Sequence, residues 1–134
     1  IPLLDDKDIK VRRAVLAALT FQGRWNYLQA QLALCAFVRD DKRAAADRKV
    51  AAQGLADIVK IDLLGTWIYK DAIWTLVGLL GDKDGGLRSI AFTALLPVKA
   101  DGFGYNPAMA EAQRAKSLEA WKDWCTKTCG AQTP

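Results

Sequence analysis

Histidine is absent from this chain of 134 residues. Its absence removes the commonest general base, the commonest metal ligand and every catalytic triad that depends on an imidazole. Cysteine is scarce, with three residues, and Cys125-x3-Cys129 has neither the spacing nor the histidine that attachment of a c-type haem requires. We therefore expect a protein that is not an enzyme and that has no metal, no cofactor and no small-molecule substrate.

Long apolar runs are also missing, since stretches such as Ile73 to Leu80 are far too short to span a bilayer. Runs of β-branched residues with period-two alternation are lacking, and alanine and leucine dominate the chain. With 51% hydrophobic and 25% charged residues, the composition predicts one packed, all-helical domain over 1–134. The chain begins at Ile1 without a leader, so we expect a processed form or a piece of something longer.

The charge is weakly basic, with a formal net charge of +4 from 19 Lys and Arg and 15 Asp and Glu. These cations are spread along the whole chain, whereas a nucleic-acid binder usually gathers them on one stripe. The densest run, 39–43, is nearly neutral within itself and is typical of a solvated loop. A protein partner is therefore favoured over nucleic acid.

An internal repeat organises the sequence. The segment Leu3 to Leu19 matches Leu79 to Leu95 without a gap, and eight of the 17 positions are identical. A weaker third copy, Arg48 to Leu55, lies between them, so that closing leucines recur after 36 and then 40 residues. A period near 40 residues with two helices per unit is typical of helical solenoids.

The first and last copies begin with Asp-x-Asp, in which Asp8 and Asp84 are predicted to cap an alanine-rich helix. Near the other end, Asn106 is predicted as the N-cap of a last helix, which carries Trp121 and Trp124 on one face and covers the last repeat. The predicted parts are a first inner helix over 1–20, a second repeat over 25–60, a third over 66–97 and a capping helix over 106–128.

The motifs Asp6-x-Asp8-x-x-Val11-Arg12-Arg13-Ala14 and Asp82-x-Asp84-x-x-Leu87-Arg88 resemble the HEAT-repeat family of armadillo-like proteins. The closing part, Gly102-Phe103-Gly104-Tyr105-Asn106-Pro107 followed by Trp121-x-x-Trp124, resembles the end of HEAT-type proteins common in certain bacteria. This resemblance implies a right-handed α-α superhelix of about three repeats plus a capping helix, which binds proteins on its concave face. Residues 39–47 depart from the pattern as an enlarged loop.

The resemblance also implies roles for individual residues. Arg12, Arg48 and Arg88 share one repeat position and are expected to bridge neighbouring repeats, or alternatively to form a row of cations for an acidic partner. The concave face is expected to bind a helix or loop that is partly apolar and partly acidic. Its predicted residues are Arg13, Leu16, Lys49, Gln53, Ser89, Phe92 and Thr93.

Aromatic and sulfur residues are mostly predicted in the core, including Trp67, Trp74 and Cys35. Trp25 and Tyr27 are less constrained and are a further candidate contact with a partner. Cys125 and Cys129 are a candidate disulfide if the last helix frays, which would favour an oxidising, extracytoplasmic compartment.

The leading functional hypothesis is a non-catalytic scaffold that docks or assembles subunits of a larger complex. The alternatives are a nucleic-acid-binding HEAT-like module that uses a basic concave face, and a HEAT-like lyase, which the lack of histidine disfavours.

Overall fold

The computed structural model describes residues 1–25, 27–59 and 70–130, and every regular element in these ranges is helical, which confirms the all-α prediction. No described helix has the length and apolar character needed to cross a bilayer. The elements are η1 (Pro2–Asp5), α1 (Ile9–Arg24), α2 (Leu28–Arg39), α3 (Ala45–Val59), α4 (Lys70–Leu79), α5 (Gly85–Leu95), η2 (Gly102–Gly104) and α6 (Glu111–Cys129).

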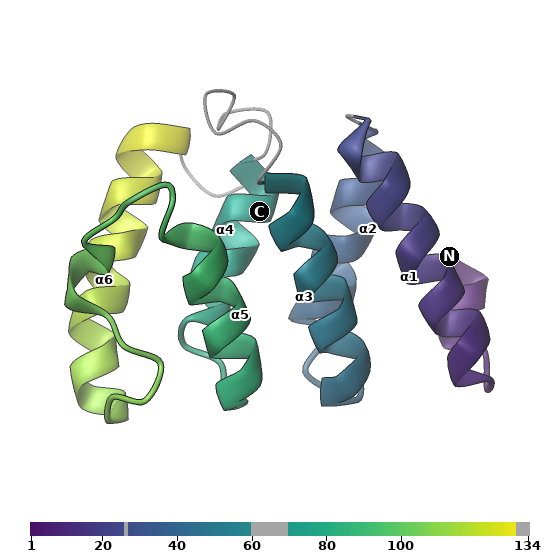
Figure 1. Cartoon of the computed structure of the whole chain (residues 1–134), viewed down its shortest axis with the longest axis horizontal. Helices are drawn as coiled ribbons and strands as arrows, with labels where there is room; N and C mark the ends of the chain where they lie inside the picture. Colours follow the sequence, from purple (N-terminus) through teal and green to yellow (C-terminus); the bar gives the residue numbers. More distant parts are fainter. Residues whose placement is uncertain (26, 60–69, 131–134) are drawn as a thin grey trace.

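The helices form two layers (Figure 1). In the front layer α1 packs beside α3, and α3 packs beside α5; behind them α2 packs beside α4, and α4 contacts α6. From α1 to α5, helices that follow one another in the chain pack across the two layers, so each front helix also contacts a back helix. The hydrophobic core lies between the layers and runs the length of the stack.

The repeated Asp-x-Asp motif begins α1 and α5 in the same way. Asp8 Oδ1 accepts a hydrogen bond from the amide of Lys10 at 2.8 Å, and Asp84 Oδ1 accepts one from the amide of Leu87 at 3.0 Å. These bonds satisfy amide groups that the first turn of a helix leaves without intrahelical partners. The predicted caps are therefore confirmed.

Small side chains set the distance between α1 and α3. A Cβ atom added to Gly54 would lie 2.2 Å from Thr20 Oγ1, and one added to Gly23 would lie 2.5 Å from Ile58 Cδ1. Such close backbone approach leaves no room for a larger residue at either glycine, because interiors are packed to high density. The front layer is thus held together by complementary small and large side chains.

The connection between α2 and α3 corrects the prediction of an enlarged loop over 39–47. α2 ends at Arg39 and α3 begins at Ala45, so this connection is as long as the one between α4 and α5. Arg43 stabilises it, since its guanidinium pairs with Asp5 at 3.0 Å and lies 4.2 Å from the centre of the Phe37 ring. The charged run is therefore an anchored turn.

The last helix begins later than predicted, at Glu111, and Asn106 is not its N-cap. Asn106 Oδ1 instead accepts a hydrogen bond from the amide of Ala108 at 2.9 Å, which forms a local turn. The preceding residues Gly102, Phe103 and Gly104 all have positive φ angles, and the Nε1 of Trp121 on α6 donates to the Gly102 carbonyl at 3.0 Å. Hydrogen bonds of the side chains and the backbone hold this loop in a non-helical conformation, so α6 begins only at Glu111.

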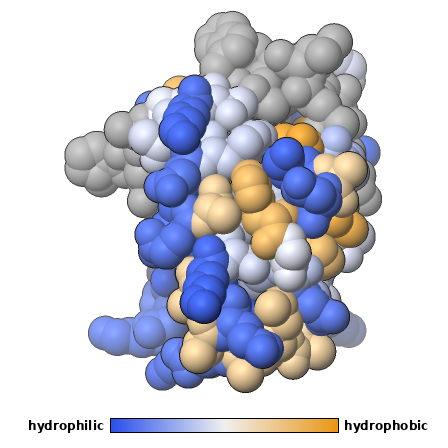
Figure 2. Space-filling model, turned by 90° about the vertical axis from the view of Figure 1, so that its left-hand side faces the viewer, coloured by the Kyte–Doolittle hydropathy of each residue, from blue (hydrophilic) through white to orange (hydrophobic). Residues whose placement is uncertain are grey.

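Helix α6 closes one end of the stack, and Figure 2 shows hydrophilic side chains flanking a central apolar strip on this end. Its inner face buries Trp121 completely, while Trp124 and Leu118 are partly buried. At its end Trp74 Nε1 donates to the Gly130 carbonyl at 3.1 Å, which ties α6 to α4.

The candidate disulfide between Cys125 and Cys129 is not formed in the structure. Cys125 and Cys129 are free, buried thiols in a helix that stays regular up to Cys129. Burial raises the pKa of both thiols above the usual value, so neither is an activated nucleophile. The argument for an oxidising compartment loses its basis with the disulfide.

Leu28 is 50% exposed at the start of α2. Trp67 lies outside the described residues, whereas Trp74 is buried as predicted.

Candidate partner-binding face

The outward side of α1, α3 and α5 carries most of the residues predicted for partner binding. Arg13, Gln53, Ser89 and Thr93 are exposed on this side, and Lys49 is partly exposed. We call this surface the front face. It combines residues from three helices that are far apart in the sequence.

Two predicted residues do not belong to the front face. Leu16 is fully buried, whereas the next residue, Ala17, is exposed. Successive residues of a helix point about 100° apart, and the side chain of Leu16 points toward the core. Phe92 is half-buried, with its ring 5.1 Å from that of Tyr105 and against Gly102. Phe92 is thus a structural contact between α5 and the loop that follows it.

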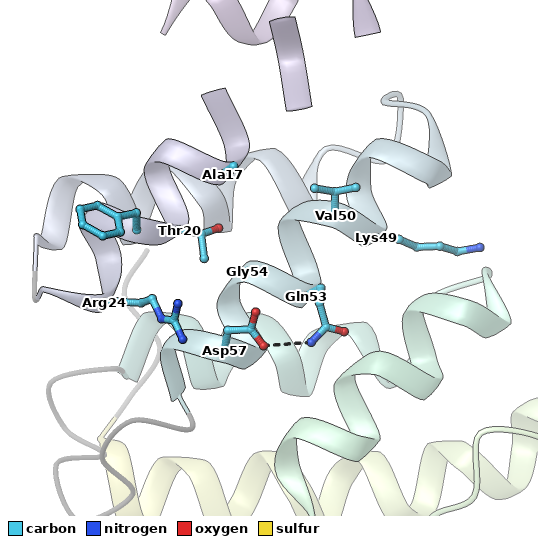
Figure 3. A pocket seen from close by; sticks show the side chains of 9 residues that line it. Ala17, Thr20, Arg24, Lys49, Val50, Gln53, Gly54 and Asp57 are labelled. Carbon is cyan, nitrogen blue, oxygen red and sulfur yellow. Dashed lines mark hydrogen bonds between the residues drawn. The ribbon is translucent and has the colours of Figure 1, made fainter. Parts of the chain in front are cut away.

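A groove of about 620 Å³ runs along the front face between α1 and α3 (Figure 3). Its floor is formed where Gly54 lies against Thr20, so the close approach of the helices makes the hollow. Gln53 Nε2 donates to Asp57 Oδ1 at 3.1 Å along the α3 side. The lining residues are Ala17, Thr20, Phe21, Arg24, Lys49, Val50, Gln53, Gly54 and Asp57.

A second hollow of about 200 Å³ lies between α3 and α5. Gln53 lines both hollows, so it stands between them on α3. The second hollow adds Ser89 and Thr93 from α5. The front face therefore offers two neighbouring hollows that together involve three helices.

Cations stand at the rim of the groove. Arg24 lies at the C-terminal end of α1, and Lys49 lies toward the opposite end of the groove (Figure 3). Lys49 Nζ is 3.5 Å from Asp84 and Arg13 Nε is 3.8 Å from Asp47, and both basic side chains keep more than two fifths of their surface exposed. These cations remain accessible to an acidic partner.

Three arginines at the shared repeat position point between helices rather than into the groove. We call them the ladder arginines, and they are Arg12, Arg48 and Arg88. Arg12 Nε donates to Asp47 of α3 at 2.9 Å, and Arg48 Nη2 donates to Asp82, just before α5, at 2.7 Å. Arg88 Nε donates to the Pro107 carbonyl in the loop before α6 at 3.0 Å. Each arginine thus ties its helix to the next unit.

Reasoning from the repeat missed three important residues. Asp47 is a buried carboxylate in α3 that occupies the repeat position of Val11 and Leu87, and this break in the apolar pattern was the available signal. Phe21 and Arg24 lie beyond the closing leucine of the first copy, where the alignment of repeats ends. The part of the groove that lies beyond Leu19 on α1 could therefore not be found by comparing the repeats.

The pKa of the Asp84 carboxyl lies below its usual value of 3.8, first because the Leu87 amide donates to it and then because Lys49 is near. A lowered pKa in the folded state favours the carboxylate, so this stabilisation is present above pH 3.8 and is lost as the pH falls through the folded pKa.

The substitution Asp84→Asn keeps the cap but removes the charge. We expect it to cost about 0.5 kcal/mol at neutral pH and nothing below the folded pKa, measured by urea unfolding across pH; an equal cost at every pH would contradict this assignment.

Comparisons with known proteins give no family for the chain. A scan against models of protein families, a search of curated proteins and a search of solved structures each found no match.

Proposed function

We propose that this chain is a HEAT-type solenoid module, a right-handed superhelix that binds a protein partner on its front face as a non-catalytic docking or assembly subunit. The observation that carries the proposal is the groove between α1 and α3, with a smaller hollow beside it between α3 and α5. The shared contacts of Arg12 and Arg88 support the repeat assignment, since each donates to the two carbonyls at its own Asp-Lys turn.

The lining of the groove defines the partner that fits it. Ala17, Val50 and the exposed ring of Phe21 offer apolar contact, while Arg24 and Lys49 place positive charge at the rim. A helix or loop with one apolar side and acidic residues beside it satisfies both features. Binding of this kind needs no catalytic group.

The charge arrangement favours such a protein over nucleic acid. The ladder arginines are engaged by Asp47, Asp82 and the Pro107 carbonyl, so they do not add to the exposed cations of the front face. Tight binding to duplex DNA requires several free cations that together replace condensed counterions.

Selection from a displayed library of random peptides against the full chain tests the proposal. We expect selected peptides to combine large apolar residues with Asp or Glu. The double variant Arg24→Gln and Lys49→Gln should weaken their binding about tenfold by loss of charge complementarity, and Ala17→Trp should abolish it by filling the groove.

The matched control is Lys122→Gln with Lys127→Gln on α6, which removes two exposed cations at a distance from the groove. Selected peptides that bind the Ala17→Trp and wild-type chains equally would refute the front face as the binding site. Binding to duplex DNA that exceeds peptide binding and falls steeply with salt would favour the nucleic-acid alternative.

A further inference from the structure

The large hydrophobic side chains that remain exposed gather at one end of the stack. Among the described residues all of them lie within the first 28, and they are Ile1, Leu3, Ile9, Phe21, Trp25, Tyr27 and Leu28. The other end is closed by α6 (Figure 1). The outer edge of α1, opposite α3, is therefore an apolar helix face that no described element covers.

We propose that this edge of α1 binds a helix of a partner protein, which packs beside α1 in the way that α1 packs beside α3. The partner helix carries an arginine in its first turn, followed by a small or acidic residue. This surface shares Phe21 with the groove, but its Asp6 and Ala18 do not line the groove, and the inference goes beyond the proposed function.

The repeat shows how the edge of α1 corresponds to surfaces that are already covered. Gly54 of α3 lies against Thr20 of α1, and its equivalent in α5, Ala94, is 2% exposed and shares a hollow with Ala56 of α3. The equivalent residue in α1 is Ala18, which is exposed. This position thus packs against the preceding front helix in α3 and in α5. In α1 it is exposed.

A carboxylate that can bind an arginine of the preceding front helix also recurs in the repeat. Asp82 Oδ1 accepts the Asp84 amide at 2.9 Å, and its Oδ2 binds the arginine of the preceding front helix, Arg48, at 2.7 Å. Asp6 is the equivalent residue and accepts the Asp8 amide through Oδ1 at 2.8 Å. Within the described part of the chain, Asp6 Oδ2 has no ion-pair partner, so the acceptor for an incoming arginine is in place.

A single difference between the copies restricts the residue after that arginine. In α5, Gly86 leaves space for the Lys49 side chain, whose Cε would lie 2.5 Å from an added Cβ. The equivalent residue in α1 is Lys10, which is exposed. A second basic residue on the partner would meet this lysine, whereas an acidic residue would pair with it and a serine, as in Arg88-Ser89, would avoid it.

Two aromatic rings extend the surface toward the C-terminal end of α1. Phe21 is 62% exposed and Trp25 is 68% exposed, with their rings 6.5 Å apart in an edge-on arrangement. Aromatic side chains that become buried on association contribute strongly to binding. They give the edge of α1 an apolar anchor beyond the alanines.

A second copy of this chain does not fit the surface. The arginines at the start of α1 and α3 are already bound to Asp47 and Asp82, and Arg88 of α5 is bound to the Pro107 carbonyl. In another copy, the described first-turn arginines of the front helices are therefore already engaged and are not available to Asp6. We therefore assign the edge of α1 to a helix of a different protein.

A tethered helix tests the proposal in the full chain. The probe is a copy of residues 9–24 with Arg13→Ser, joined ahead of Ile1 by a flexible Gly-Ser linker that gives a high effective concentration. We expect amide hydrogen exchange in residues 21–25 of the original α1 to slow about tenfold relative to the unfused chain. Asp6→Asn or Ala18→Arg in the original chain should restore the unfused rate.

Both control substitutions lie at exposed or half-buried positions, and Asp6→Asn keeps an acceptor for the Asp8 amide. Unchanged exchange in the fusion, or slowing that survives Ala18→Arg, would overturn the proposal. Dimerisation of the unfused chain that Ala18→Arg abolishes would also overturn it, because the edge would then serve self-association. Peptide binding in the groove should not respond to Ala18→Arg, so failure here is distinct from failure of the proposed function.

Discussion

Replacing Trp121 with alanine is expected to lower the free energy of unfolding by about 3–5 kcal/mol. Its side chain is fully buried, and its ring meets those of Phe103 at 5.1 Å and Trp124 at 5.6 Å. The substitution leaves a large cavity between α6 and the loop, and it removes the donor that satisfies the buried Gly102 carbonyl. Urea unfolding followed by circular dichroism measures the loss.

Two further variants separate packing from hydrogen bonding. Trp121→Phe keeps most of the apolar contact but leaves the Gly102 carbonyl without its donor, so we expect a loss of about 1–3 kcal/mol. Trp124→Ala removes a partly buried ring and should cost less than Trp121→Ala. A cost for Trp121→Ala no larger than that of a surface substitution would show that α6 does not seal the stack.

Arg48→Ala is expected to cost about 3 kcal/mol, because it breaks a buried ion pair by removing one partner. The residue is 6% exposed, and its guanidinium joins the Val38 carbonyl at 2.8 Å to Asp82 at 2.7 Å. The truncation leaves the Val38 carbonyl and the Oδ2 atom of Asp82 without the hydrogen bonds from Arg48, in an environment that is largely shielded from water. The same urea unfolding experiment gives the value.

The matched control for Arg48 is Arg13→Ala on the neighbouring helix of the front layer. Arg13 is about half exposed, and its Nε is 3.8 Å from Asp47, so the expected cost is below about 1 kcal/mol. Arg48→Lys keeps the charge but cannot donate in two fixed directions, and it should lie between the two variants. Equal costs for Arg48→Ala and Arg13→Ala would refute the structural role of the ladder.

Much of the fold was predictable because its signals are local. The Asp-x-Asp motif places the caps at Asp8 and Asp84, and helical spacing of apolar residues identifies the helices. The N-cap at Asn106 was wrong because its side chain bonds the Ala108 amide, and nothing in the local sequence distinguishes this turn from a helix start. Loop geometry there depends on contacts with Trp121 and Arg88, which are distant in sequence.

The candidate site was predictable only in part. Gln53 and Thr93, which the repeat alignment selected, line the hollows, because equivalent positions on parallel helices share a direction. The alignment misplaced Leu16, since a shift of one residue turns a helix position by about 100° and only packing decides which side is buried. The aromatic and basic residues at the end of α1 lie beyond the repeat and required the structure.

Nuclear magnetic resonance titration of the isotope-labelled chain with a selected acidic, amphipathic peptide tests the central claim most directly. The account predicts that amide shifts change at Ala17, Thr20, Arg24, Gln53 and Asp57, which line the groove between α1 and α3. Shift changes confined to α2, α4 and α6 would contradict it, because they would place the partner on the back layer.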